Sequence, residues 1–507
     1  MQMRGVVEVA ETKGYASWGK VVVLAGVGIN LCLGVLYTWS MFTSALTNKL
    51  AFSAAEALTP YAIALGVFGL TMVFAGRLQD RIGPRVAASI GGVLVGAGMV
   101  IASFAPKADA AASATFTALK PLADKAAAVG ADPAVVASFE ATSKAAFAAA
   151  KAVLVPNVGA SLPWLAIGFG ILTGAGIGFA YAAATPAAVK WFAPTKKGLI
   201  SGTVVAGFGL ASVYTAPLTG NLLATVGIND TFLFLGLGFF VAITLFAQLL
   251  RNPLPGYMPA ADTRPHQAAA IAKGPSRDYT WQEMVRTRQF WLMWAMYAVA
   301  AGAGLMVVGI IAKYAQGIPA VFDQLTTITN GFKGGGLDWV AKAGATFTFV
   351  MALAIGNGAG RPIAGIVSDR IGRTKTMMGV FMLQAAFMVL LASGVVADYT
   401  VLLVLGAFVG AMYGANLTLF PSMCYDFFGT KHGGVNYGLV FTAWGAGGVL
   451  GSIGSGLAKD VFGNFNNAFW AAAGLLVVAT VLAAFVKAPH EVPSHETATA
   501  EAADAGA

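Results

Sequence analysis

Charged side chains are scarce in this 507-residue chain: Asp, Glu, Lys and Arg together make up 10 % of it, whereas 57 % is apolar. Soluble globular domains carry about 25 % charged residues, so this composition excludes an ordinary soluble protein. The formal charge is +9, but the basic residues lie in short segments between apolar runs and do not suggest a nucleic-acid-binding face. The composition instead predicts a membrane protein in contact with the lipid bilayer.

Cysteine and histidine are also rare. The two cysteines, Cys32 and Cys424, are too isolated for a metal site and are not expected to pair. All four histidines fall outside the apolar runs, and the sequence has no HExxH, GxSxG or P-loop motif. The sequence therefore predicts no enzyme activity, no bound metal and no cofactor.

Twelve apolar runs are long enough to cross a hydrocarbon core of about 30 Å, which takes roughly 20 helical residues. The predicted spans are 20–45, 55–77, 85–105, 163–188, 199–219, 230–250, 289–313, 342–366, 376–396, 399–422, 434–457 and 466–487. Every arginine except Arg361 falls in the termini or in every second connection, which the positive-inside rule places in the cytoplasm. We therefore expect a multi-pass protein of the inner (cytoplasmic) membrane with both termini in the cytoplasm.

Two sequence repeats indicate a duplication. GRLQDRIGPR from Gly76 is copied as GIVSDRIGRT from Gly365, and WFAPTKKGLISG at 191–202 resembles FFGTKHGGVNYG at 427–438. From Gly76 to Phe192 is 116 residues, and from Gly365 to Phe428 is 63. The excess of 53 is close to the length of an Ala-rich stretch at 106–161. Without this insert the halves are in register, which predicts an all-α membrane protein with twelve transmembrane helices in two six-helix repeats.

This register divides the chain into five parts. They are a cytoplasmic tail 1–19, a six-helix bundle 20–250 with an outer insert 106–161, a cytoplasmic linker 251–288, a second bundle 289–487 and a tail 488–507. Within the insert, 120–154 could form one or two amphipathic helices, which we interpret as a surface elaboration. Parallel halves of this kind imply a cavity between them at mid-membrane.

The duplicated motif resembles the signature loop of the major facilitator superfamily. Four further segments resemble the oxalate/formate antiporter family, which shares features with monocarboxylate transporters: TWQEMVRTRQFW at 280–291, NGAGRPIAGIVSDRIGR at 357–373, LFPSMCYDFFG at 419–429 and NYGLVFTAWGAGGVLG at 436–451. The resemblance implies the major facilitator fold and transport of small organic carboxylates by alternating access, with a monomer as the functional unit.

Arg361 lies well inside the eighth predicted span, where an uncompensated cation is costly and usually lines a pathway. Its planar guanidinium offers a fork of donors that matches a carboxylate. Pairing with Asp369 is the alternative, although eight residues of helix separate the two by about 12 Å. The family resemblance points to the same arginine as a substrate ligand.

The resemblance also implies an aromatic pocket. Tyr37, Tyr181 and Tyr413 match aromatic positions of the family's site, and Phe441 and Trp444 share a face of the eleventh span. Trp444 stands where the oxalate:formate antiporter has a lysine. One cavity cation balances one carboxylate better than two, which favours formate, glycolate, lactate or pyruvate over oxalate. Oxalate:formate exchange is the alternative.

Acidic residues are missing from the span interiors. Asn357, which we expect among the substrate-binding residues, stands where proton-linked monocarboxylate transporters carry an Asp one turn before the arginine. This replacement favours exchange or uniport over proton symport. Asp80 and Asp369, with the adjacent Arg81 and Arg370, lie at the inner ends of spans, and we expect them to act as gating latches. A carboxylate sensor with a transporter fold is the alternative from another class, because its binding site would look the same.

Overall fold

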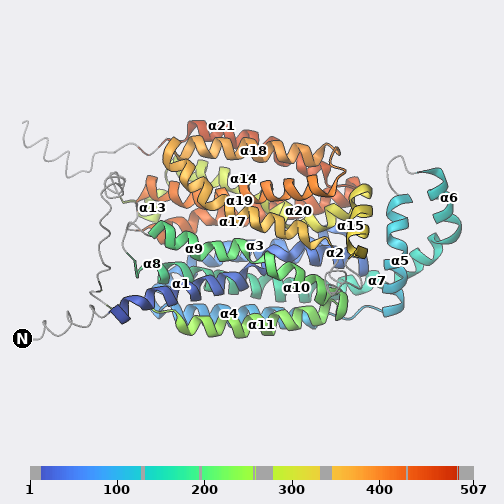
Figure 1. The fold of residues 1–507 in the computed structure, drawn as a ribbon, viewed down its shortest axis with the longest axis horizontal. Helices are drawn as coiled ribbons and strands as arrows, with labels where there is room; N and C mark the ends of the chain where they lie inside the picture. Colours follow the sequence, from blue (N-terminus) through green and yellow to red (C-terminus); the bar gives the residue numbers. More distant parts are fainter. Residues whose placement is uncertain are drawn as a thin grey trace, which may run out of the picture.

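The computed structural model describes residues 13–126, 132–192, 197–254, 257, 278–331, 345–429, 432–487 and 489. All regular elements in these ranges are helical (Figure 1). In chain order they are α1 (Lys13–Leu33), η2 (Gly34–Thr38), α2 (Trp39–Lys49), α3 (Ala54–Ile82), α4 (Pro84–Ser103), α5 (Ala110–Ala126), α6 (Pro133–Thr142), α7 (Lys144–Leu165), η3 (Ala166–Thr173), α8 (Gly174–Val189), α9 (Lys197–Leu210), α10 (Ser212–Thr225), α11 (Gly227–Leu249), α13 (Trp281–Met284), α14 (Arg288–Gln316), α15 (Pro319–Gly331), α17 (Phe347–Ile371), α18 (Arg373–Ala392), α19 (Tyr399–Phe428), α20 (Gly433–Phe462) and α21 (Asn466–Phe485).

Eleven helical segments in the described ranges are long and apolar enough to cross a membrane, and each coincides with a predicted span. Three of them combine several elements: Ser17–Lys49 joins α1, η2 and α2, Lys144–Val189 joins α7, η3 and α8, and Leu199–Thr225 joins α9 and α10. The one predicted span without such a segment is the eleventh, 434–457, which is α20. This helix has 30 residues but includes nine glycines, so its apolar character is weaker. The predicted all-α membrane fold is confirmed.

The insert lies at one end of the bundle, which we call the insert end. In Figure 1, α5 and α6 stand beyond the ends of α2, α10 and α15, whereas α13 lies at the opposite end. The last helix of the insert is continuous with the fourth span, because the helical segment Lys144–Val189 runs through 161 without a break. The stretch 120–154 therefore contributes to three helices, α5, α6 and α7.

The duplicated motif makes the same turn twice, at the end that we call the motif end. Gly83 ends α3 with a φ of 83°, and Gly372 ends α17 with a φ of 93°. Glycine adopts this left-handed conformation without the strain that a Cβ atom would cause. Each glycine also starts the next helix, so the sequence repeat is a structural repeat at this turn.

Close backbone contact fixes the position of α17. A Cβ atom on Gly410 of α19 would lie 2.1 Å from Leu353 O, and one on Gly360 would lie 2.1 Å from Ala411 O. Small residues of this kind let helices approach closely in lipid, where no hydrophobic force drives them together. The α17–α19 contact therefore depends on glycine and determines where the side chains of α17 point.

Helices from the two halves of the sequence pack along a shared seam. α3 lies along α20, α2 along α14, and α9 and α10 along α17. At the first contact a Cβ atom on Gly69 would come within 3.1 Å of Gly445 Cα, and at the second Thr43 Oγ1 donates to Gly309 O at 3.1 Å. The third contact contains Arg361.

Candidate functional site

Arg361 is the one charged residue in the buried set of the described chain, with 5 % of its surface exposed. It lies in α17, fourteen residues after Phe347 and ten before Ile371. At 1.5 Å per residue it is about 15 Å from the motif end of the helix, which is half the thickness of a hydrocarbon core. This depth agrees with the position expected from the sequence.

The guanidinium of Arg361 has neutral partners. Nη1 donates to Val205 O at 3.0 Å, and Nε and Nη2 donate to Asn357 Oδ1 at 3.3 and 3.2 Å. The alternative of pairing with Asp369 is wrong, because that carboxylate accepts from Arg373 Nη1 at 2.7 Å. A buried cation without a counter-charge is costly. The described surroundings of Arg361 therefore offer dipoles but no carboxylate, and an anion would complete them.

The five aromatic residues expected in the pocket come together. Tyr37 and Tyr413 share a hydrogen bond of 2.7 Å between their hydroxyl oxygens, and Trp444 Nε1 donates to Tyr413 Oη at 2.8 Å. Phe441 stacks on Trp444 with ring centroids 5.0 Å apart, and Tyr181 lies 6.3 Å from Phe441. Because η2 and α8 come from the first half and α19 and α20 from the second, both halves contribute to this cluster.

The aromatic cluster adjoins Arg361. The hydroxyl groups of Tyr37 and Tyr181 both interact electrostatically with the guanidinium. Asn357 is fully buried, and its side chain also interacts with the Tyr37 hydroxyl. The amide therefore links Arg361 to the aromatic cluster.

Two phenylalanines of this cluster were not predicted. Phe68 lies 5.1 Å from Trp444 and 5.4 Å from Phe441 between ring centroids. Phe208 lies 4.9 Å from Tyr37 in an edge-to-face arrangement. Together they cover the aromatic cluster from the first half of the chain.

The sequence repeat contained a signal for both. Phe68 precedes the first copy of the duplicated motif by eight residues, as Asn357 precedes the second copy. Phe208 follows the last glycine of WFAPTKKGLISG by six residues, as Trp444 follows the last glycine of its counterpart. Aligning the two halves of the sequence therefore pairs Phe68 with Asn357 and Phe208 with Trp444, and this alignment could have predicted both phenylalanines.

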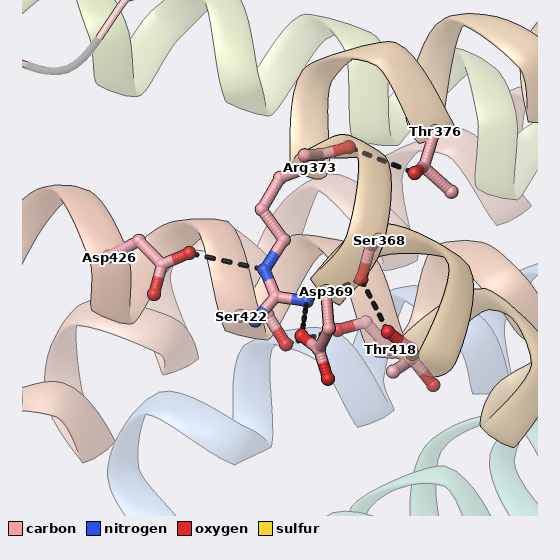
Figure 2. Close-up of polar contacts among 9 residues, drawn as sticks. Ser368, Asp369, Arg373, Thr376, Thr418, Ser422 and Asp426 are labelled. Carbon is pink, nitrogen blue, oxygen red and sulfur yellow. Dashed lines mark hydrogen bonds and ion pairs between the residues drawn. The ribbon is translucent and has the colours of Figure 1, made fainter. Parts of the chain in front are cut away.

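At the motif end, Arg373 holds two carboxylates (Figure 2). Its Nη1 lies 2.7 Å from Asp369 Oδ1, its Nε lies 3.2 Å from Asp426 Oδ2, and it also donates to Ser368 Oγ. The partner that the structure shows for Asp369 is therefore Arg373 rather than the expected Arg370. The cluster joins α17, α18 and α19 within the second half of the chain.

The first copy of the motif is less fully described. Arg81 is exposed in the last turn of α3, and the side chain of Asp80 lies outside the described part of the structure. In the second copy the carboxylates of the ion pairs are 51 and 69 % exposed. Exposed pairs of this kind contribute about 0–1 kcal/mol, so the cluster is suited to breaking and reforming.

Comparison with known proteins decides the family. A sequence profile described as the Major Facilitator Superfamily matches residues 110–336 and 340–506. The chain belongs to this superfamily. The oxalate:formate antiporter of Oxalobacter formigenes is 27 % identical over 475 residues, which cover 93 % of this chain and 91 % of that protein. The apicoplast pyruvate carrier 1 of Toxoplasma gondii is 40 % identical over 60 residues, 12 % of this chain and 11 % of the carrier.

A solved structure shows the same architecture. The xylose transporter XylE from Escherichia coli, in a partially occluded inward open conformation, matches with a TM-score of 0.60 and covers 93 % of this chain and 100 % of that chain. At 13 % identity this likeness concerns the fold alone. The protein is thus a multi-pass membrane transporter of the major facilitator fold, and its resemblance to the oxalate/formate antiporter family is confirmed.

Proposed function

We propose that this major facilitator transporter carries small organic carboxylate anions, with Arg361 as the main substrate ligand. The observation that carries the proposal is that its buried guanidinium is bound to neutral oxygens alone in the described structure. Hydrogen bonds to Val205 O and Asn357 Oδ1 use one N–H on each nitrogen, and the Tyr181 hydroxyl also interacts with the guanidinium. A carboxylate is a stronger acceptor than these neutral oxygens, and a guanidinium can bind it in bidentate geometry.

We further propose that monocarboxylates such as formate, glycolate, lactate or pyruvate are favoured. The side chain at the position of the family's second cation is Trp444, which is 1 % exposed and bonded to Tyr413. A single buried cation leaves one charge of a dianion uncompensated in a low-dielectric site. The short match to a pyruvate carrier points the same way, whereas the longer match to the oxalate:formate antiporter supports oxalate:formate exchange as the alternative.

Transport would follow from rocking of two bundles, 20–250 and 289–487, joined by the linker 251–288 and flanked by the tails 1–19 and 488–507. Two hydrogen bonds now bridge the bundles at the centre, one from Arg361 to Val205 and one between Tyr37 and Tyr413. A carboxylate bound to Arg361 gives the guanidinium a charged acceptor, which weakens its hydrogen bond to the neutral oxygen of Val205. Substrate occupancy therefore favours reopening of the seam on either side.

Orientation and coupling are part of the proposal. We expect the protein in the inner membrane of the cell. Arginines gather near the motif end, including Arg77, Arg85 and Arg370, so the positive-inside rule favours a cytoplasmic position for that end and for both termini. The insert end then faces outward. The buried set of the described chain contains no acidic residue, which favours exchange or uniport over proton symport through a buried carboxylate. One chain holds the whole cluster, so the functional unit is a monomer.

Counterflow in proteoliposomes tests the proposal. Vesicles loaded with unlabelled formate, lactate or oxalate should accumulate the labelled acid from outside, and the variant Arg361→Gln should not. A carboxylate sensor would bind the acid without exchanging it, so binding without counterflow would favour that alternative. Strong stimulation of uptake by an imposed pH gradient at fixed membrane potential would contradict exchange or uniport.

A further inference from the structure

A cavity of about 360 Å³ lies at the insert end, away from Arg361. It is lined by the ends of α2, α10 and α14, by α15, and by Thr117 of the insert. The size falls in the range of small-molecule sites, about 300–1,000 Å³. Much of its polar lining comes from Ser44, Asn48, Lys49, Thr117, Gln316 and Thr346, and no described residue that lines it is acidic.

Lys49 supplies a cation to the wall of this cavity. Its Nζ donates to Leu223 O, near the end of α10, at 3.2 Å. An ammonium group has three donors, so this contact leaves two for other partners. Capping the C-terminal end of α10 would by itself explain a lysine at this place, but it would not explain a second lysine nearby.

Lys313 supplies that second cation from beneath the cavity. Its Nζ donates to Asn48 Oδ1, and the Nδ2 of the same asparagine donates to Gln316 Oε1 at 2.8 Å. Ser44 Oγ donates to the same oxygen at 2.7 Å. Ser44, Asn48 and Gln316 line the cavity, and Lys313 lies behind Asn48 rather than in the lining. The network joins α2 to α14 across the seam between the two halves.

The insert adds little net charge here. Lys120 and Asp124 of α5 both interact with Lys313, but they also form an ion pair with each other. Lys459 of α20 also interacts with Lys313, and Lys49 is the one charged residue in the described lining of the cavity. The insert is fixed beside the cavity, because Ser113 Oγ donates to the backbone oxygen of Lys49 at 2.9 Å and Thr117 is among the lining residues.

We propose that this cavity is a second carboxylate-binding site, a vestibule in which Lys49 and Lys313 concentrate the anion above the closed seam. The proposal rests on the proposed function insofar as the anion then moves on to Arg361. A cleft lined by one sign of charge raises the local concentration of a counter-ion by tenfold or more. The vestibule would therefore lower the concentration needed for transport from the insert side without changing the rate at saturation.

Chemical labelling tests the site without requiring transport. Reductive methylation of Lys49 in the purified protein should be slowed by millimolar formate or lactate, but not by chloride at equal ionic strength or by the neutral amide lactamide. The protection should persist in Arg361→Gln, because the vestibule does not include that residue. No protection, equal protection by chloride, or loss of protection in Arg361→Gln would each overturn the proposal.

Transport kinetics provide a second readout. The double variant Lys49→Gln/Lys313→Gln should raise the half-saturating carboxylate concentration about tenfold from the insert side at low salt. It should leave the maximal rate and the half-saturation from the motif side unchanged. Lys49→Arg should behave like the unmodified protein because it keeps the charge. Lys151→Gln, an exposed lysine of the insert in α7, is the matched control.

The two proposals fail in different ways. If the unmodified protein exchanges no carboxylate, the proposed function is wrong, and the methylation experiment still decides whether the vestibule binds one. If exchange depends on Arg361 but the half-saturating concentrations of the double variant and of the unmodified protein agree within twofold, the vestibule is wrong and the central site stands.

Discussion

Substitution of Arg361 by lysine and by glutamine separates the charge of the proposed ligand from its geometry. Glutamine removes the charge. At an effective dielectric constant of about 20, a cation and an anion about 4 Å apart attract each other by roughly 4 kcal/mol, so carboxylate affinity should fall about a thousandfold. Lysine keeps the charge but lacks the two parallel N–H donors of a guanidinium.

The loss for lysine follows from the donors that the structure already uses. The guanidinium donates to Val205 O and to Asn357 Oδ1. The three donors of an ammonium cannot make these contacts and two parallel bonds to a carboxylate. A hydrogen bond to a charged group contributes about 1.5–3 kcal/mol, so Arg361→Lys should lose roughly 10- to 100-fold in affinity.

Equilibrium binding of labelled formate or lactate to detergent-purified protein would measure both losses, with counterflow in proteoliposomes as the functional readout. Arg288→Gln, an exposed arginine at the start of α14, is the matched control and should bind normally. Size-exclusion profiles would show that each variant is folded. Affinity of Arg361→Gln within threefold of the unmodified protein would refute the assignment of Arg361 as the substrate ligand.

Three further predictions concern selectivity and packing. Trp444→Lys adds a second cation to the site and should shift competition assays toward oxalate and away from lactate or formate; unchanged selectivity would mean that charge count does not set the preference. Tyr413→Phe removes the hydroxyl that bonds both Tyr37 and Trp444 and leaves two buried groups unpaired, at about 1–3 kcal/mol each. Its melting temperature should fall clearly in a thermal-shift assay, and an unchanged value would contradict the observed network. Gly410→Val should prevent α17 from packing on α19, because even a Cβ atom would meet a backbone oxygen at 2.1 Å, whereas Gly379→Val, with nothing within 4 Å of such an atom, should express normally. Equal yields of folded protein would refute the close approach.

The depth of Arg361 could be predicted because it depends on local counting along the chain. Its distance from the end of an apolar run fixes its depth in a helix, whatever the neighbouring helices do. Its partners could not be predicted in this way. Val205 is 156 residues away in sequence and meets the guanidinium because α9 packs against α17. For the same reason the sequence suggested the adjacent Arg370 as a partner of Asp369, whereas the turn at Gly372 brings Arg373 onto that carboxylate.

For the aromatic residues, too, the sequence predicted positions but not contacts. Tyr37 and Tyr413 are 376 residues apart, and no periodicity of one helix predicts their hydrogen bond. The resemblance to a family pointed to these positions, and the internal repeat held the information for Phe68 and Phe208. When one residue of a site is known, the residue at the equivalent position of the other repeat can be predicted to lie in the same site.

The sequence by itself determined the membrane class, the spans, the duplication and the one cation at mid-depth. The membrane class, the spans and the depth of the cation follow from lengths and composition along single helices, because the bilayer imposes the same requirements on every helix that crosses it. The duplication follows from the repeated motifs and their spacing. Only the tertiary structure decided that this cation lacks a carboxylate partner in the described protein. The tertiary structure also decided that an aromatic cluster adjoins the cation through Tyr37 and Tyr181, and that Lys49 of α2 lines a cavity beside the insert. These features arise where helices distant in sequence approach each other, and that approach is set by glycine contacts and side-chain shape rather than by the pattern along one helix.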